Sequence, residues 1–391
     1  MKHNILRKLN ILLLISLVGF CLTACGGDNS GGDSVVGQGT LSTSLTDSST
    51  DEYQAVYVTI ARVDVHHDGS DTWETVANPD KTYNLLELVN GVRETLGITP
   101  LAAGHYTQMR LIIGETPEEQ GLNIFDMRHP YTNYIISPDD TSHELKVPSG
   151  TNTGLKIVNG FDINENETTE LILDFDAMRS VVQAGSSGKY LLKPTIKVLD
   201  TANYSMIDGT VLDADAPLVG TALVTAQVTD PGNPEVEEQV VIKAGTLADE
   251  NDQYTLFLEP GNYNLVAVQA DYLPECAAVT LPTDSSTTID FILMTATTAP
   301  GTISGTVVIS GSTSDEQYVT IDFRQEVTCE NALDATMITI KSINIADGGS
   351  YTVELPEGDY QVVASTYDEV TQSFEDVVVE AGTTTSLDIT F

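Results

Sequence analysis

The sequence predicts an all-β protein of three tandem β-sandwich domains, which follow an N-terminal export signal and a flexible tether. Thr, Val and Ile are abundant in short alternating runs that Gly, Pro, Asn and Asp separate. Two blocks of the C-terminal half repeat with an offset of 96 to 97 residues. The stretch with most helical character, 85–97, contains Gly91 at its centre, so a turn or one short helical piece is expected there.

Residues 1–24 have the features of an export signal. Lys2, Arg7 and Lys8 precede an apolar run at 11–22 that is too short to span a bilayer as a mature helix. The following LTAC at 22–25 resembles the lipobox of bacterial lipoproteins, which implies that the Cys25 thiol is acylated and begins the mature chain. An ordinary secretory signal with an incidental cysteine is the alternative.

The segment 25–38 is predicted to be a lipidated cysteine and a flexible tether. Its Gly, Ser, Asp and Asn residues cannot bury a core. Because no second apolar stretch is long enough to span, we expect membrane attachment in the cell envelope through lipid alone. Gly26 directly after the cysteine resembles lipoproteins sorted to an outer membrane, which leaves open whether the periplasmic or the outer face carries the protein.

The chain is strongly acidic, with 57 acidic and 17 basic residues and a formal net charge of −40. Residues 201–391 contain only Lys243, Arg324 and Lys341 as basic residues. Such a surface repels nucleic acid, so no nucleic-acid partner is expected. The charge suits a saline environment, in which salt screens self-repulsion, and specific cation binding is the less favoured interpretation.

No cofactor is expected, apart from weak calcium binding by acidic loops, because calcium prefers oxygen ligands. None of these loops has the spacing of an EF-hand. The acidic loops in question are Asp213–Asp215, Asp249–Asp252 and Asp139–Asp140.

The C-terminal half contains two copies of one domain. IDGTV at 207–211 matches ISGTV at 303–307, and GNY at 261–263 matches GDY at 358–360. We therefore assign residues 203–297 to repeat 1 and residues 301–391 to repeat 2, each short enough for a small β-sandwich. The segments 287–293 and 385–391 are predicted to be their last strands.

These repeat motifs resemble those of the carboxypeptidase-regulatory-like, transthyretin-like sandwich domains, which have a carbohydrate-binding-like fold. The resemblance implies spacer modules or adhesion stalks on exported proteins, a few of which bind sugars. In each repeat the Gly-x-Tyr motif starts a strand, and Tyr263 and Tyr360 resemble the tyrosine corner of sandwich domains. A looser copy places Tyr106 in the same role, so these three tyrosines are expected to be structural.

Residues 39–200 form the front domain, which has other motifs. GTLSTSLTD at 39–47, VYVTIARVDVHHDG at 56–69 and YLLKPTIKV at 190–198 resemble the bacterial lipoprotein family catalogued as domain of unknown function 4382. The resemblance implies a lipid-anchored, β-rich domain, without an established chemistry.

Two cysteines, Cys276 and Cys329, remain in the mature chain beside Cys25. An exported protein permits a disulfide, which would join repeat 1 to repeat 2. Two separate buried thiols are the alternative.

His66, His67 and Asp68 are weak candidates for a metal site. Adjacent side chains on a strand point to opposite faces, and zinc needs three or four converging ligands, so no metal site is predicted here. Trp73 could form a sugar-stacking platform with Tyr131 and Tyr134, although a single Trp is more often packed in a core.

The stretch DFDAMRSV at 174–181 and the lysines that follow it are the densest constellation of charges. If 170–176 pairs with 189–199, the lysines could meet the aspartates across the ladder and hold the domain's closing hairpin. A polar groove for a glycan is the alternative. The residues concerned are Asp174, Asp176, Arg179, Lys193 and Lys197.

The sequence contains no catalytic motif: there is no Gly-x-Ser-x-Gly, no phosphate loop and no Cys–His pairing, so we predict that the protein is not an enzyme. It is expected to be a lipid-anchored envelope protein with a binding or structural role toward a polysaccharide or an envelope protein, with its repeats as a stalk. An accessory protein that binds metal or acts on carbohydrate through the front domain is the alternative. Any polar binding site is expected in the front domain's loops.

Overall fold

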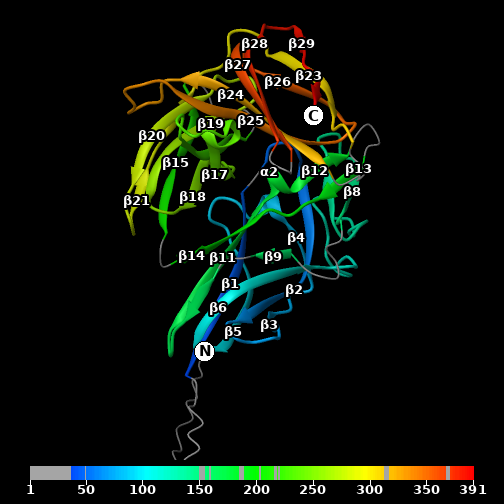
Figure 1. The fold of residues 1–391 in the computed structure, drawn as a ribbon, viewed down its shortest axis with the longest axis vertical. Helices are drawn as coiled ribbons and strands as arrows, with labels where there is room; N and C mark the ends of the chain where they lie inside the picture. Colours follow the sequence, from blue (N-terminus) through cyan, green and yellow to red (C-terminus); the bar gives the residue numbers. More distant parts are fainter. Residues whose placement is uncertain are drawn as a thin grey trace, which may run out of the picture. The chain divides into compact units, whose positions relative to one another are not determined.

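The protein is described by a computed structural model, in which nearly all regular structure is strand (Figure 1). This confirms the predicted all-β class. The described residues are 37–48, 50–148, 155–157, 160–184, 189–201, 204–214, 218, 221–311, 317–366 and 370–391. Their helices are all short, and none is long and apolar enough to cross a membrane. They are the 3₁₀ helices η1 (Leu85–Glu87) and η4 (Val236–Gln239) and the helix α2 (Ala177–Ser180).

The first sheet of the front domain has the order β14-β11-β1-β5. Its centre is β1, which runs parallel to β11 and antiparallel to β5. The strands are β1 (Gln38–Ser48), β5 (Glu94–Ala102), β11 (Thr168–Asp176) and β14 (Ile196–Asp200).

The second sheet of the front domain has the order β10-β6-β2-β7-β8-β13-β12, with β3 and β4 paired to β2 and β9 paired to β6. The strands are β2 (Ala55–His67), β3 (Glu74–Ala77), β4 (Lys81–Asn84), β6 (Gly104–Ile113), β7 (Tyr134–Ile136), β8 (Ser142–Lys146), β9 (Leu155–Ile157), β10 (Phe161–Ile163), β12 (Val181–Ala184) and β13 (Lys189–Leu192).

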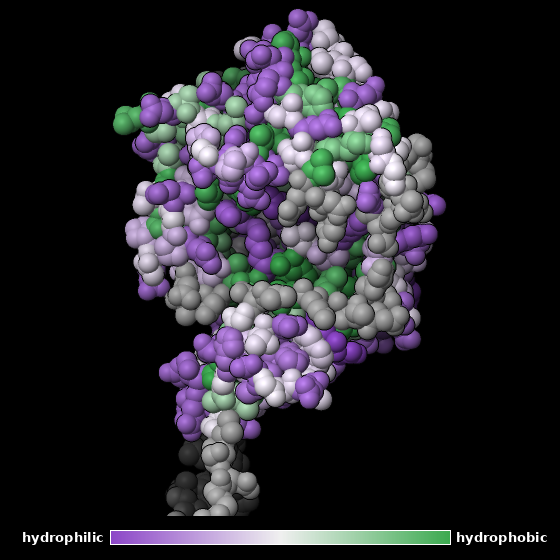
Figure 2. Space-filling view, viewed as in Figure 1, coloured by the Kyte–Doolittle hydropathy of each residue, from purple (hydrophilic) through white to green (hydrophobic). Residues whose placement is uncertain are grey.

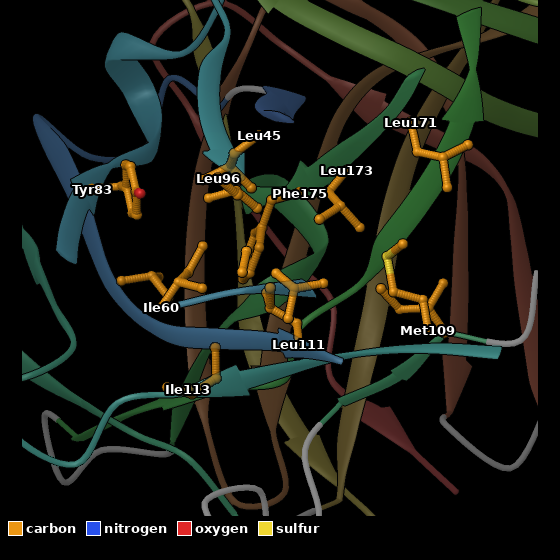
Figure 3. Close-up of a cluster of buried hydrophobic side chains, with 14 of the residues drawn as sticks. Leu45, Ile60, Tyr83, Leu96, Met109, Leu111, Ile113, Leu171, Leu173 and Phe175 are labelled. Carbon is orange, nitrogen blue, oxygen red and sulfur yellow. The ribbon is translucent and has the colours of Figure 1, made fainter. Parts of the chain in front are cut away.

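The core of the front domain combines side chains from both of its sheets (Figure 3). Leu45, Leu173 and Phe175 from the first sheet are fully buried, as are Ile60 and Leu111 from the second. The alternation of the strands therefore places one face of each sheet in the same core, as a sandwich requires.

The stretch 85–97 contains only the short helix η1, as the sequence predicted. Asn90 and Gly91 follow it with φ of 58° and 75°, in the left-handed region, which ends any helix. The chain then enters β5 at Glu94.

The two repeats have the same strand order. The first sheet is β18-β15-β21 in repeat 1 and β26-β23-β29 in repeat 2, with β22 and β30 paired to β15 and β23. The second is β17-β16-β19-β20, matched by β25-β24-β27-β28. Repeat 1 comprises β15 (Ser205–Asp213), β16 (Leu223–Thr229), β17 (Val240–Leu247), β18 (Gln253–Leu258), β19 (Gly261–Val268), β20 (Glu275–Leu281), β21 (Ser286–Thr288) and β22 (Phe291–Leu293). Repeat 2 comprises β23 (Gly301–Val308), β24 (Tyr318–Val327), β25 (Thr336–Ala346), β26 (Ser350–Leu355), β27 (Gly358–Thr366), β28 (Thr371–Val379), β29 (Thr384–Ser386) and β30 (Ile389–Thr390).

The last strand of each repeat is interrupted, whereas the alternation at 287–293 and 385–391 predicted one continuous strand. In repeat 1 the Asp290 carboxylate leaves the ladder and accepts the backbone N–H of Thr210 at 2.9 Å. Asp388 does the same for Thr306 in repeat 2, at 2.8 Å. Gly209, which precedes Thr210, allows this close approach of the two chain segments, because a Cβ on Gly209 would lie 1.8 Å from the Ile289 carbonyl oxygen.

Tyr106, Tyr263 and Tyr360 have the geometry of a tyrosine corner. Each hydroxyl donates to the backbone carbonyl four residues earlier: Ala102 at 3.1 Å, Glu259 at 2.8 Å and Pro356 at 2.9 Å. The three rings are buried, so these side chains fix the entry to a strand and are not available to a ligand.

We expect Tyr360→Phe to lower the free energy of unfolding by about 1 kcal/mol, because the Pro356 carbonyl loses its buried donor while the ring stays packed. Urea denaturation followed by circular dichroism measures the change. Tyr131→Phe, at a half-exposed ring, is the control and should have little effect. A loss as small as that of the control would show that the hydroxyl does not stabilise the corner.

Candidate functional site

Residues 37–391 form one compact unit, and contacts between its three domains build the candidate site. Repeat 1 and repeat 2 are covalently joined by a disulfide between Cys276 and Cys329. Beside it, Ala277 and Glu330 form an isolated parallel bridge, in which the Glu330 N–H donates to the Cys276 carbonyl at 2.8 Å. The edge strand β20 of repeat 1 is thereby attached to the β24–β25 loop of repeat 2.

A buried arginine makes a second connection between the repeats. The Arg324 side chain has no exposed surface. Its guanidinium donates to the carbonyls of Val236 at 2.7 Å and Glu237 at 2.9 Å, and at 3.2 Å to the Asp322 carboxylate of its own strand. The carbonyls lie around η4, so this helix of repeat 1 is bound to the sheet of repeat 2.

Asn90 connects the front domain to repeat 1. Its side-chain amide donates to the Gln253 carbonyl at 2.7 Å, and its side-chain oxygen accepts the Thr255 N–H at 2.8 Å. One carboxamide thus makes the two hydrogen bonds that a neighbouring strand would make to β18. Arg93 lies over the ring of Phe257 at 4.3 Å in the same contact.

Lys341 connects repeat 2 to the front domain. Its ammonium lies 2.8 Å from the Asp51 carboxylate and also contacts Glu52. Burial opposes the charge on Lys341, but the two carboxylates outweigh burial and raise the lysine's pKa. The ion pair is therefore present throughout the neutral range.

Two further contacts continue the sheet of repeat 2 into the front domain. Strand β25 pairs in parallel with β12 at Ile345 and Gln183. The Asn344 amide donates to the Met178 carbonyl at 2.7 Å. The predicted stalk does not fit these contacts, because both repeats bind the front domain within one compact unit.

The Lys341 ion pair and the β12–β25 contact line an open cleft of about 940 Å³, to which all three domains contribute. A volume of this size is typical of ligand-binding clefts. The front domain contributes residues 50–53 with Met178, Val181 and Gln183, and repeat 1 contributes 268–274 and 296–297. Repeat 2 contributes 340–345 and 350–357, and the linker between the repeats contributes Thr298 and Pro300.

Acidic side chains dominate the charge of the cleft. Among the described residues that line the cleft, Lys341 is the one basic residue, and it is already paired with carboxylates. Hydrophilic residues are spread over much of the described surface in Figure 2, interspersed with pale and hydrophobic ones. The cleft therefore disfavours anionic ligands and suits a neutral or cationic one. The lining carboxylates are Asp51, Glu52, Asp271, Glu354 and Glu357.

The predicted charge constellation of the front domain forms in part. Strands β11 and β14 pair antiparallel, with Asp174 directly opposite Lys197. The Asp176 carboxylate accepts the Arg179 N–H at 3.0 Å and begins α2. Lys193 lies over the Tyr318 ring of repeat 2 at 4.7 Å, which places it at a domain contact that the hairpin alternation did not predict.

The aspartates are buried, which the sequence did not indicate. Burial and then the charges of Asp174 and Asp176 raise the pKa of Asp47 on the neighbouring strand β1 well above its usual value. Burial raises the pKa of Asp174 to about 7, against the opposing charge of Lys197. The Lys197 ammonium itself donates to the Lys243 carbonyl of repeat 1, so the predicted hairpin network extends into a domain contact.

We expect Asp174→Asn to remove a pH dependence of stability. A carboxyl whose pKa rises from about 3.9 to about 7 on folding stabilises the fold below pH 4, and that contribution is lost between about pH 4 and pH 7. Relative to wild type, the variant should therefore gain about 2–4 kcal/mol of unfolding free energy from pH 4 to pH 8. Urea denaturation at both pH values measures this, with the exposed Asp71→Asn as control. Parallel pH profiles for Asp174→Asn and wild type would contradict the assignment.

The histidine candidates do not converge. His66 lies 3.3 Å from the Thr107 hydroxyl and packs against Trp73, while the His67 ring contacts the Asp68 carbonyl at 2.6 Å and packs against Tyr106. Among the described residues, no group of three His, Cys, Asp or Glu side chains could hold a metal ion.

The aromatic platform does not form either. Trp73 lies under Arg110 at 4.4 Å, whereas Tyr134 is fully buried, stacks on Tyr57 and hydrogen-bonds His129 at 2.8 Å.

Two aspartates of the acidic loops act as turn residues. Asp249 and Asp139 each accept N–H groups of their own turn. Asp215 lies outside the described residues.

The sequence predicted a polar site in the front domain's loops, and the cleft between the three domains was not predicted. One signal could have indicated it: the acidic C-terminal half retains very few basic residues. Two of them, Arg324 and Lys341, bind partners in other domains.

No curated protein matches the chain. It is similar to the Bacillus anthracis TIE protein (12% identity, TM-score 0.19, 90% of this chain), of which it spans half. It is also similar to the Streptococcal ancillary pilin, with 11% identity and a TM-score of 0.19 over 90% of this chain and 99% of that chain. A third similar structure is the shaft pilin SpaA of Lactobacillus rhamnosus GG, with 9% identity and a TM-score of 0.18 over 48% of this chain and 96% of that chain. TM-scores this low carry no conclusion about function. Residues 38–194, which make up most of the front domain, match the model of the family described as Domain of unknown function (DUF4382).

Proposed function

We propose that this chain is a lipid-anchored, non-enzymatic binding protein of the bacterial cell envelope, attached to the outer membrane through Cys25. Its ligand site is the cleft between the three domains, and its ligand is a polysaccharide or another envelope protein. The observation that carries the proposal is the open cleft of about 940 Å³. Support for a fixed site comes from the disulfide, the Arg324 contacts and the Lys341 ion pair, which hold its walls together.

The lipid anchor has a direct test. Cys25→Ala removes the only thiol of the LTAC motif, so the protein should move from the membrane fraction to the soluble fraction. Immunoblotting of the two fractions after cell lysis gives the distribution, with Cys21→Ala in the apolar run as the control that stays membrane-bound. Retention of Cys25→Ala in the membrane would contradict lipid attachment.

The cleft is tested by filling it. Thr298 and Thr352 are exposed and line the cleft, so Thr298→Trp/Thr352→Trp should occlude it without disturbing the core. The full chain, purified in detergent, is measured against immobilised neutral polysaccharides and against synthetic peptides. We expect the wild type to bind one of these classes and the filled variant to lose that binding. Thr328→Trp/Thr384→Trp, at exposed positions outside the cleft, is the matched control. Equal binding by the filled variant and wild type would exclude the cleft as the site.

A further inference from the structure

One wall of the cleft is the edge of a sheet. Strand β26 lies at the end of the order β26-β23-β29, and among the described strands it pairs with β23 alone. Residues 350–357, which include the whole of β26, line the cleft. Alternate residues of an edge strand turn their N–H and C=O groups away from the sheet, so β26 presents peptide groups to the cleft.

Repeat 1 shows what the equivalent edge binds. Strand β18 occupies the place of β26, and the registers agree, because Tyr254 faces Gly209 as Tyr351 faces Gly305. In repeat 1 the outward groups are the Gln253 carbonyl and the Thr255 N–H, both of which are hydrogen-bonded to the Asn90 side chain. The outer edge of this strand is thus able to bind a strand-like partner.

The corresponding groups of repeat 2 are those of Ser350 and Thr352. By the shared register, the Thr352 N–H points away from β23, toward the cleft. Both residues are exposed, as is Glu354 two residues further along the strand. In repeat 1 the Asn90 side chain of the front domain binds the outer edge of β18. In repeat 2 the equivalent edge, that of β26, faces the cleft.

We infer that the cleft binds an extended, basic peptide segment of a partner protein, which adds as a strand to the edge of β26. This rests on the proposed function and names the ligand class of the same cleft. Main-chain hydrogen bonds to an edge strand supply affinity in this mode of recognition, and side chains on either side supply specificity. Here the specificity is electrostatic, because Asp271, Glu354 and Glu357 are exposed carboxylates that the Lys341 ion pair leaves available. A second copy of this acidic chain is the wrong charge for the site.

The probes are three short synthetic peptides: alternating Lys and Val, the same sequence with N-methyl groups on alternate backbone nitrogens, and alternating Glu and Val. Fluorescence anisotropy with the full chain in detergent measures their binding. The Lys–Val peptide should bind at least about tenfold more tightly than either of the others, since methylation blocks strand pairing and Glu is repelled. Equal binding of the methylated and unmethylated peptides would overturn strand addition while leaving the proposed cleft function intact.

The matched variants act on one peptide group. Thr352→Pro removes the outward N–H without removing a hydrogen bond to β23, and edge strands tolerate proline at such positions. Thr352→Val keeps the N–H. We expect Thr352→Pro to weaken Lys–Val binding about tenfold and Thr352→Val to preserve it. Equal binding by both variants, each with a wild-type melting temperature, would overturn the inference.

A second pair of variants keeps the proposal testable if Thr352→Pro fails to fold. Glu354→Lys/Glu357→Lys reverses the charge of the cleft wall and should abolish Lys–Val binding. Glu326→Lys/Glu380→Lys makes the same charge change at exposed positions of repeat 2 outside the cleft and should not. Equal loss in both double variants would assign the binding to net charge and overturn the site. No binding of the Lys–Val peptide to wild type would overturn this inference, and the polysaccharide arm of the filled-cleft experiment would then decide the proposed function on its own.

Discussion

Arg324→Met should lower the free energy of unfolding by about 3–5 kcal/mol, because the buried guanidinium is the donor that joins repeat 1 to repeat 2. Methionine fills a similar volume, but the part-buried carbonyls of Val236 and Glu237 and the buried carbonyl of Val240 lose their donor. The Asp322 carboxylate also loses its partner, although it stays partly exposed and bonded to Ser342. Most of the loss therefore comes from the lost hydrogen bonds to these three carbonyls.

Urea denaturation monitored by circular dichroism measures the effect. Arg324→Lys restores the charge but not the planar fork of donors, so it should recover only part of the lost stability. Arg128→Met, at an exposed arginine, is the matched control and should change the free energy of unfolding by less than about 0.5 kcal/mol. A loss below about 1 kcal/mol for Arg324→Met would mean that the guanidinium does not hold η4 to repeat 2.

The elements of the fold were largely predictable because they depend on local pattern. Alternating Thr, Val and Ile residues specified the strands, and Gly91 excluded a long helix at 85–97. The repeated Gly-x-Tyr motif located equivalent strand starts in the two repeats. The interruption of each last strand was not predictable, because it depends on a carboxylate, that of Asp290 or Asp388, that bonds a distant N–H group.

The candidate site was much less predictable, since it is made of contacts between residues far apart in the chain. Lys341 and Asp51 are 290 positions apart, and nothing in the local sequence of either indicates the other. The pairing of Asp174 with Lys197 followed from strand alternation, whereas the contact of Lys193 with Tyr318 required knowledge of how repeat 2 meets the front domain. Sequence repetition gives the domains, but only tertiary structure gives the surfaces at which they meet.

Removal of the disulfide is the second change with a large expected effect. Cys276 and Cys329 are 53 residues apart, and closing a loop of that length in the unfolded chain is worth about 4 kcal/mol of stability in the chain-entropy account. The Cys276→Ser/Cys329→Ser variant should therefore unfold with a free energy lower by about 3–4 kcal/mol. The remaining contacts between the repeats, including those of Arg324, should still allow it to fold.

Denaturation of wild type with and without dithiothreitol, and of the double variant under both conditions, separates the bridge from other effects of the substitutions. Reductant should destabilise wild type and leave the double variant unchanged, because the variant has no bond to reduce. Mass spectrometry after alkylation counts free thiols in the native protein, and no label should enter at Cys276 or Cys329 before reduction. Labelling of both cysteines in unreduced, folded protein would contradict the bridge. Without that bridge, noncovalent contacts alone would hold repeat 1 against repeat 2, and the walls of the cleft would be less fixed.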